Sequence, residues 1–301
     1  MARLDKKGMR PGARVKLSQE KRHPTDFALW KFSGNNSKRQ MQWESLWGVG
    51  FPGWHLECSA MAMKYLGETI DIHTGGIDHI PVHHTNEIAQ SEAATGKSFV
   101  NYWLHCAFLL IEGEKMSKSL GNIFTLDDLV AKEHDPLAFR YLLLTSHYRS
   151  LMNFTWGSLR GAETALATLR SYLGEWPDGG EAEEDLVRSF RERINDDLDT
   201  PRAIAHIWES VIDSKQLSPN VKKATILDFD RVLGLNLSTA RTEYVADGDV
   251  PLEIRTLLNK RDRLRVEKQW AEADQVRQRI ASLGYLIEDT TFGVRLKRNQ
   301  K

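Results

Sequence analysis

The sequence predicts an α/β segment, then a mostly helical segment, and finally a small basic module. Up to about residue 122, short apolar runs alternate with glycine turns and with segments of helical periodicity. From there to Ile226, helix-capping residues dominate. Residues 251–301 then carry twelve Lys and Arg against seven Asp and Glu, a net charge of +5. The expected domain ranges are 1–124, 125–237 and 238–301.

The composition is that of an ordinary soluble protein, since 41% of the 301 residues are hydrophobic and 27% are charged. This excludes a collagen, a mucin or a fully disordered chain. Because 41 Lys and Arg balance 41 Asp and Glu, a nucleic-acid surface must be local. The only cysteines, Cys58 and Cys106, exclude a disulfide framework. No apolar run approaches the ~18 residues of a membrane span, and residues 1–14 lack a signal-peptide core, so we expect a cytoplasmic protein that binds no membrane.

The α/β segment shows strand, glycine turn, helix and strand in succession. Glycines end both predicted helices, and a Thr-Gly-Gly turn follows the central strand. This order is typical of a parallel α/β unit, in which ligands bind at the carboxyl ends of the strands. The predicted elements are a short strand within 27–32, a helix over 54–67, a strand over 69–73, a helix over 83–95 and a strand over 102–111.

Capping residues mark the helical segment. Thr125 and Asp128 form a potential capping box, and Asp135 and Thr200 each precede a proline that fits a first helical turn. We expect helices throughout 125–226, apart from a glycine- and acid-rich loop over 177–184. A linker over 238–249, a charged helix and a turn-and-strand pattern around 286–295 complete the chain.

Three residues form a candidate zinc site. His83 and Glu87 are four apart and so share a helix face, and Cys58 offers a thiolate from another helix. Taken singly, Cys58 also fits a small buried residue of the core, and His83 fits a hydrogen-bonded polar residue.

Two further motifs suit phosphate chemistry. Lys115 and Lys118 lie in the hydroxyl-rich string Lys115-Met-Ser-Lys-Ser119, where two ammonium groups can reach different oxygens of one polyphosphate. A lysine-rich surface loop is the alternative for a bare Lys-x-x-Lys pattern. At the end of the predicted strand, Gly75 and Gly76 let backbone amides approach a nucleotide, and Asp78 can bind ribose hydroxyls.

Four stretches together resemble consecutive blocks of the cysteinyl-tRNA synthetases, which are class I aminoacyl-tRNA synthetases. The resemblance runs from about Gly12 to Arg298 and implies ATP-dependent activation of cysteine, followed by transfer to tRNA(Cys). It implies Zn²⁺ as cofactor and ATP with Mg²⁺ as substrate. The stretches are Gly53-Trp-His-Leu-Glu-Cys-Ser-Ala-Met61, Asp71-Ile-His-Thr-Gly-Gly-Ile-Asp78, His83-His-Thr-Asn-Glu87-Ile-Ala-Gln-Ser91 and Glu114-Lys-Met-Ser-Lys-Ser-Leu-Gly-Asn122.

The resemblance also assigns roles to residues. It implies that a zinc ion recognises the substrate thiol and that Trp54 lies against the bound cysteine. In the family a second cysteine completes the zinc ligand set, and that residue would precede this sequence. As a fourth ligand Cys106 is a poor substitute, because its position is not a ligand in the family. His84 could serve, but its side chain should point elsewhere on the helix. The implied roles are catalysis for Lys115 and Lys118, ATP binding for Gly75, Gly76, Asp78 and Lys118, and zinc binding for Cys58, His83 and Glu87.

The sequence departs from the family in lacking the His-x-Gly-His signature of class I synthetases. We therefore expect an incomplete Rossmann-like domain and impaired activity of the chain alone. The first half is then lost or supplied by a separate polypeptide. The alternatives are a non-catalytic tRNA-binding relative, against which the lysines and zinc ligands argue, and a ligase joining cysteine to a small amine, against which the long C-terminal module argues.

The basic module is the expected tRNA surface. Arg261, Arg265 and Lys268 are three and four apart, which predicts one helix face that tracks phosphates. The resemblance implies that this region reads the anticodon, although Leu296 stands where the family commonly has tryptophan. A merely solvated face is the alternative. The preceding helices are expected to face the tRNA stem.

Overall fold

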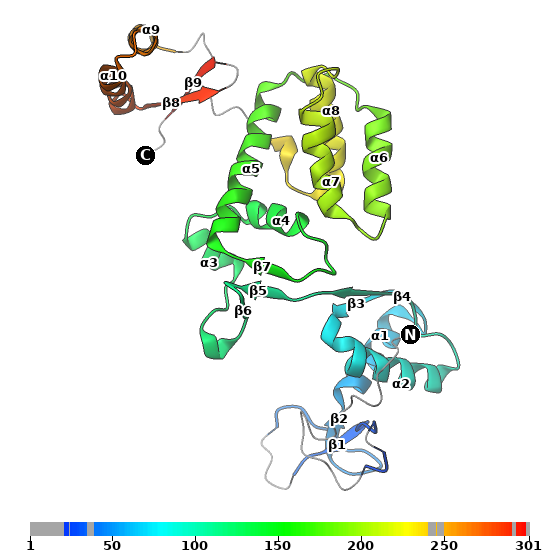
Figure 1. Cartoon of the computed structure of the whole chain (residues 1–301). Helices are drawn as coiled ribbons and strands as arrows, with labels where there is room; N and C mark the ends of the chain where they lie inside the picture. Colours follow the sequence, from blue (N-terminus) through cyan, green and yellow to red (C-terminus); the bar gives the residue numbers. More distant parts are fainter. Residues whose placement is uncertain are drawn as a thin grey trace. The chain divides into compact units, whose positions relative to one another are not determined.

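The computed structural model describes residues 21–23, 25–34, 39–239, 245, 250–290 and 293–298 (Figure 1). The chain divides into two compact units: residues 1–116 with 148–153, and residues 117–147 with 154–301. The expected division at 124 and 237 stays a prediction. Residues 1–14 and most of the predicted linker over 238–249 lie outside the described residues.

The first unit is built around two parallel strands, β3 (Ile70–Gly76) and β4 (Val100–Cys106). Between them the chain passes through the short helical turns η1 (Ile77–His79) and η2 (Ile80–His84) and the helix α2 (Thr85–Thr95). Such a crossover is what a parallel pair requires. The predicted order of strand, turn, helix and strand is confirmed, although β3 runs on through the glycine turn because its ladder with β4 continues to Gly76.

Helix α1 (Trp54–Leu66) precedes this unit's sheet and packs against α2. Both helices end at the predicted glycines, Gly67 and Gly96, where the backbone has φ of 94° and 70°. These values favour glycine because it carries no Cβ. The core beside the sheet is small and consists of Ile70, Phe99 and Val100.

The remaining strands up to Phe154 form two further sheets of short strands. One is a hairpin of β1 (Trp30–Phe32) and β2 (Gly50–Pro52). The other has the order β6-β5-β7, formed by Glu114–Lys115, Leu109–Ile111 and Met152–Phe154. The predicted strand over 102–111 is therefore two strands. The prediction that 125–226 is helical outside one loop is wrong at β7, because that strand is defined by a partner about 40 residues earlier rather than by a local pattern.

Helices dominate the second unit. The capping box of Thr125 and Asp128 is present, and Asp135 caps the next helix as predicted. The predicted cap at Thr200 is one residue too far along the chain, because the side chain of Asp199 accepts the hydrogen bond from the Arg202 N–H. The helices are α3 (Leu126–Ala131), α4 (Pro136–Leu144), α5 (Trp156–Glu175), α6 (Glu184–Asn195), α7 (Thr200–His206) with the π-turn η4 (Ile207–Ile212), and α8 (Pro219–Leu233).

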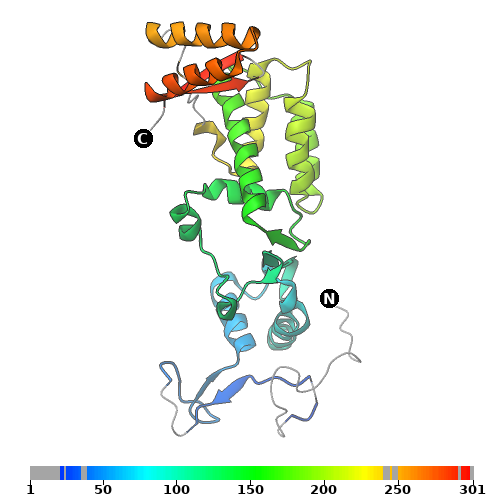
Figure 2. The same cartoon turned by 60° about the vertical axis from the view of Figure 1, so that its left-hand side comes forward.

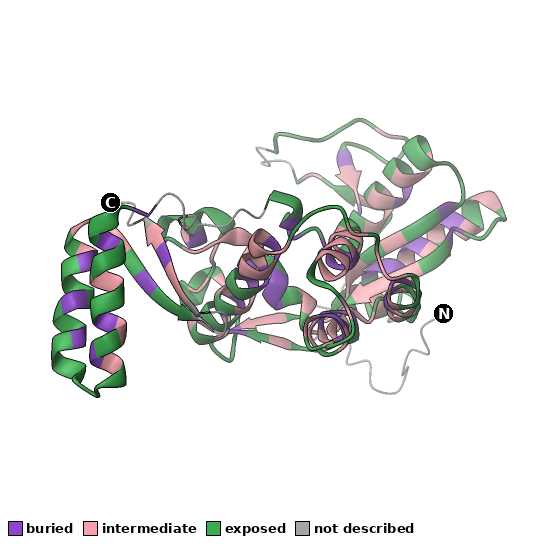
Figure 3. Cartoon of the chain, turned by 90° about the horizontal axis from the view of Figure 1, so that it is seen from above, coloured by how far each residue is buried: buried purple, intermediate pink, exposed green. Residues whose placement is uncertain are grey.

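The last part of this unit is a helix pair with a hairpin. Helices α9 (Leu252–Val266) and α10 (Trp270–Ser282) lie side by side (Figure 2), and β8 (Tyr285–Thr290) pairs with β9 (Gly293–Arg298). Buried positions recur along both helices among exposed ones (Figure 3). They form a separate apolar cluster of Val250, Ile254, Leu264, Ala273, Val276, Ile280, Ile287 and Leu296.

No helix among the described residues is long and apolar enough to cross a membrane.

Candidate active site

Cys58, His83 and Glu87 converge in the first unit. One ligand atom from each lies within 4.8 Å of the other two. Helix α1 carries Cys58, the π-helical turn η2 carries His83, and α2 carries Glu87. Sequence spacing predicted one α-helix for His83 and Glu87, whereas His83 lies in the wider π-turn that precedes it, a feature often found at functional sites.

The two carboxylate oxygens of Glu87 have different neighbours. Oε2 lies 2.9 Å from Nε2 of His73 and 4.0 Å from Nε2 of His84. Oε1 lies 3.5 Å from Nε2 of His83, yet it is buried and makes no hydrogen bond to any residue that the structure describes. A buried carboxylate oxygen without a donor is costly unless a further ligand satisfies it.

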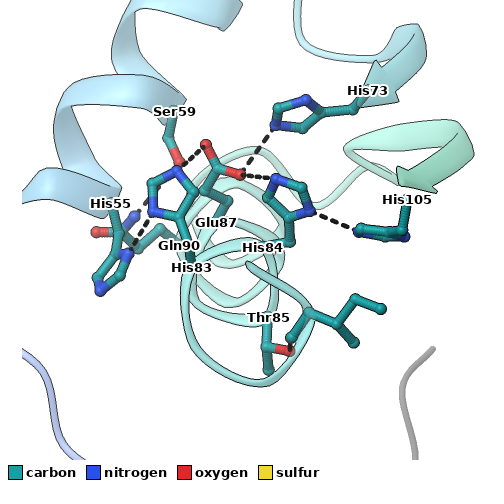
Figure 4. A network of polar contacts seen from close by, with 10 residues as sticks. His55, Ser59, His73, His83, His84, Thr85, Glu87, Gln90 and His105 are labelled. Carbon is teal, nitrogen blue, oxygen red and sulfur yellow. Dashed lines mark hydrogen bonds and ion pairs between the residues drawn. The ribbon is translucent and has the colours of Figure 1, made fainter. Parts of the chain in front are cut away.

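Imidazoles extend from this carboxylate in both directions (Figure 4). Nδ1 of His55 lies 2.8 Å from Nδ1 of His83, and Nδ1 of His84 lies 2.8 Å from Nε2 of His105. Sequence reasoning singled out only His83 and His84 of this cluster. A signal was present, since six of the ten histidines fall between residues 55 and 105, but their proximity depends on the fold.

Burial favours the neutral forms of His83 and His84. It lowers the pKa of His83 to about 4 and that of His84 to about 3, and neighbouring imidazoles add to the effect. Burial likewise raises the pKa of the Cys58 thiol, helped by the charge of Glu87, and raises the pKa of Glu87. Neutral imidazoles offer lone pairs to a cation. A bound divalent ion would stabilise the thiolate and the carboxylate and so lower the pKa values that burial raises.

Trp54 covers one side of His83. The two rings are stacked with centroids 4.0 Å apart and planes 22° apart, while about half of Trp54 remains exposed. The arrangement places an indole surface directly beside the candidate ligands. A small substrate bound there would meet both.

The glycines at the end of β3 have a local role that the sequence did not reveal. A Cβ on Gly75 would lie 2.5 Å from Cε1 of His84 and 2.8 Å from Nδ1 of His79. A Cβ on Gly76 would lie 2.5 Å from the Asp78 carboxylate. The imidazole cluster and Asp78 therefore leave no room for larger residues at these two positions.

The lysine motif spans the boundary between the two units, so only its local geometry is defined. Lys115 ends β6, and Lys118 begins the short turn η3 (Lys118–Leu120). The Ser117 hydroxyl accepts the Leu120 N–H, and the Ser117 N–H donates to Oδ1 of Asn122 at 2.8 Å. These bonds shape the loop around Lys118.

The C-terminal module corrects the expected stripe of cations. Arg261 is only 3% exposed and makes two hydrogen bonds to Asp289, of 2.8 and 2.5 Å. Lys268 lies beyond the end of α9, where its φ of 59° separates α9 from α10. The prediction of one shared helix face is therefore wrong, because Arg261 faces the interior and the helix ends before Lys268.

Arg265 is different, because it is partly exposed. It contacts Asp289 at 2.5 Å, and its guanidinium lies 6.0 Å from the ring centroid of Trp270. Trp270 is itself exposed at the start of α10. Sequence reasoning gave neither Trp270 nor Asp289 a functional role, although a tryptophan beside a basic run is a recognisable signal.

Comparisons with known proteins place this chain in a family. Residues 1–164 match the model of the tRNA synthetases class I (C) catalytic domain, and residues 247–295 match that of the cysteinyl-tRNA ligase anticodon binding domain. Among solved structures, LeuRS of Agrobacterium radiobacter K84 in a ternary complex has 15% identity and a TM-score of 0.47, and the match covers 66% of this chain and 33% of that one.

Relatives agree along almost the whole chain. Cysteine–tRNA ligase 1 of Burkholderia lata is 51% identical over 297 residues, which cover 98% of this chain and 62% of that protein. Cysteine–tRNA ligase of Treponema denticola is 37% identical, covering 96% of this chain and 65% of that protein. The comparisons give no support to a separate polypeptide that supplies the remainder. The chain belongs to the cysteinyl branch of the class I tRNA synthetases.

Proposed function

We propose that this chain takes part in the ATP-dependent activation of cysteine and its transfer to tRNA(Cys). The observation that carries the proposal is the group of half-buried Cys58 with buried His83 and Glu87, next to the half-exposed Trp54. Family membership supports the same reaction, since the relatives are named cysteine–tRNA ligases. The comparisons do not favour a non-catalytic relative or a small-amine ligase.

Cys58, His83 and Glu87 are proposed to hold Zn²⁺. A thiol, an imidazole and a carboxylate are the donor types that zinc prefers. In addition, Oε1 of Glu87, which accepts no hydrogen bond from the described residues, lies next to His83. When bound, zinc supplies a Lewis acid that can bind the thiol of cysteine and so distinguish it from serine. His73 holds the other carboxylate oxygen, and Trp54 offers an apolar surface to the substrate.

The phosphate-binding roles are proposals of the same kind. Gly75, Gly76 and Asp78 lie where β3 ends, which is where a parallel α/β sheet binds nucleotides. A Rossmann-like arrangement is supported by the parallel pair and its crossover. Lys115 and Lys118 are proposed to stabilise the charge that develops on the phosphates of ATP, which would bind together with Mg²⁺.

For tRNA, we propose that Arg265 and Lys268 contact phosphates and that Trp270 lies among them as a stacking surface. Arg261 has an indirect role, because its bonds to Asp289 fix α9 against β8. The helices of residues 125–237, α3 to α8, stay the proposed stem-facing part.

Titration calorimetry of the zinc-loaded chain with cysteine and serine tests the proposal. We expect cysteine to bind and serine to bind at least tenfold more weakly, because only a thiol is a good ligand for zinc. Glu87→Gln should remove both the zinc and the preference, whereas Cys106→Ser should keep both. Equal binding of the two amino acids by zinc-loaded protein would contradict the proposed substrate.

A further inference from the structure

The hairpin of β1 and β2 gathers aromatic side chains on one face. Phe32 pairs with Gly50, and Trp43 forms a bridge to Gly50 from the opposite side. Trp30 and Phe32 are two residues apart on β1 and so project from the same face. The three segments thus form a very small sheet with an aromatic surface.

Gly50 makes room for the Trp30 ring, and Gly48 lies near both Trp30 and Phe32. The Trp30 indole N–H donates to the Gly48 carbonyl at 3.3 Å, and a Cβ on Gly50 would lie 2.5 Å from that indole nitrogen. Cε1 of Phe32 lies 4.0 Å from the Cβ position of Gly48. Trp47 packs against Trp30 with ring centroids 6.4 Å apart. The Trp30–Trp47 pair and Phe32, which lies two residues from Trp30 on the same face of β1, are called here the aromatic platform.

The aromatic platform is open to solvent. Phe32 is 63% exposed and Trp47 is 69% exposed. Exposed apolar groups of this kind mark interaction sites. Flat rings with open faces are suited to stacking, and every nucleobase offers a face that can stack on them.

Charge and position favour RNA as the occupant. The described residues between 21 and 53 hold four Lys and Arg against two acids, and one acid, Asp26, is engaged by the N–H groups of Arg22 and His23. The hairpin also adjoins the candidate active site, because the Gly53 N–H donates to the Leu29 carbonyl and Trp54 follows at the start of α1.

We propose that the aromatic platform stacks unpaired nucleotides of the tRNA 3′ end. The inference rests on the proposed function, because the 3′ end is the acceptor that must reach the site at Trp54 and Cys58. Stacking is tolerant of base identity, so the platform would position the acceptor end without reading sequence.

The test compares the full chain's affinity for intact tRNA(Cys) and for tRNA(Cys) trimmed of its unpaired 3′ nucleotides. Wild type should bind intact tRNA more tightly by about tenfold per stacked base. Phe32→Ala combined with Trp47→Ala should remove that difference and leave binding of trimmed tRNA unchanged. Phe32→Tyr with Trp47→Phe should restore it, and Tyr65→Ala, an exposed aromatic position on α1, should have no effect.

A short single-stranded RNA with the 3′-end sequence, followed by quenching of tryptophan fluorescence, separates this inference from the proposed function. Suppose that tRNA does not bind, whereas the short RNA binds to wild type and not to the double Ala variant. This result would support the aromatic platform and contradict the proposed tRNA surface. If both tRNAs bind equally and the double variant, folded by circular dichroism, matches wild type, the platform assignment is overturned. The assignment is also overturned if wild type forms a concentration-dependent dimer that the double variant does not form, while RNA binding is the same in both.

Discussion

Nε2 of His73 lies 2.9 Å from Oε2 of Glu87, so an imidazole on strand β3 orients a carboxylate on helix α2. The other oxygen of Glu87 then faces His83 and the Cys58 group. This pairing makes the glycine-rich strand part of the candidate metal site. It also suggests why Gly75 is needed, since a side chain there would displace His84 and His79.

Purified chain should contain close to one zinc ion per molecule by elemental analysis. Cys58→Ser and Glu87→Gln should each lower the content strongly, because each removes one of the three proposed ligands. Cys106→Ser is the matched control, since Cys106 is exposed and lies outside the group. Zinc content that is unchanged in Cys58→Ser would contradict the site.

Replacing His73 should weaken the metal rather than abolish it. Loss of a partner that orients a ligand typically costs about 10–100-fold in metal affinity, so His73→Ala should fall in this range in a competition assay with a chelator. His73→Gln, which can still donate to Glu87, should recover part of the loss. If His73→Ala binds zinc as tightly as wild type, the contact has no orienting role.

The sequence predicted the three proposed ligands but not their surroundings. Spacing brings His83 and Glu87 together because four residues span about one helical turn, and that part needs no knowledge of the fold. His55, His73 and His105 come from three other elements. The crossover from β3 to β4 brings His73 and His105 into the cluster, and the packing of α1 against α2 brings His55 next to His83. For the same reason, local capping signals located the ends of α1 and α2 and the starts of α3, α4 and, within one residue, α7, whereas the long-range pairing of β7 was missed.

Asp289 should make the C-terminal module sensitive to acid. Hydrogen bonds from Arg261 and Arg265 lower the pKa of Asp289 to about 2. A depressed pKa contributes stability that is present above the ordinary value of about 4 and is lost as the pH falls through about 2. Because the Asp289 side chain is 44% exposed, we expect only about 1 kcal/mol after solvent screening. Denaturant unfolding should show Asp289→Asn less stable at pH 6, with the difference shrinking towards pH 2.

The two lysines of the motif should act mainly on the reaction rate. In a chimera that joins this chain to the N-terminal part of the Burkholderia lata relative, Lys115→Ala and Lys118→Ala should each lower cysteine-dependent pyrophosphate exchange by about ten- to a thousand-fold. Lys97→Ala, which removes a surface ion pair with Glu68, should leave the rate unchanged. Unchanged exchange in both lysine variants would contradict their proposed roles.

The last prediction separates the two arginines that the sequence grouped together. Each phosphate contact releases counterions, so tRNA affinity should fall as salt rises, with a slope set by the number of contacts. Arg265→Ala and Lys268→Ala should each reduce that slope by about one unit, because these residues are proposed to face phosphates. Arg261→Ala should leave the slope nearly unchanged in the molecules that remain folded, since its guanidinium is buried against Asp289, and should instead lower the stability of the module. A slope that falls only in Arg261→Ala would reverse this assignment, whereas equal slopes in all three variants would move the tRNA surface to the Arg140–Arg149 region.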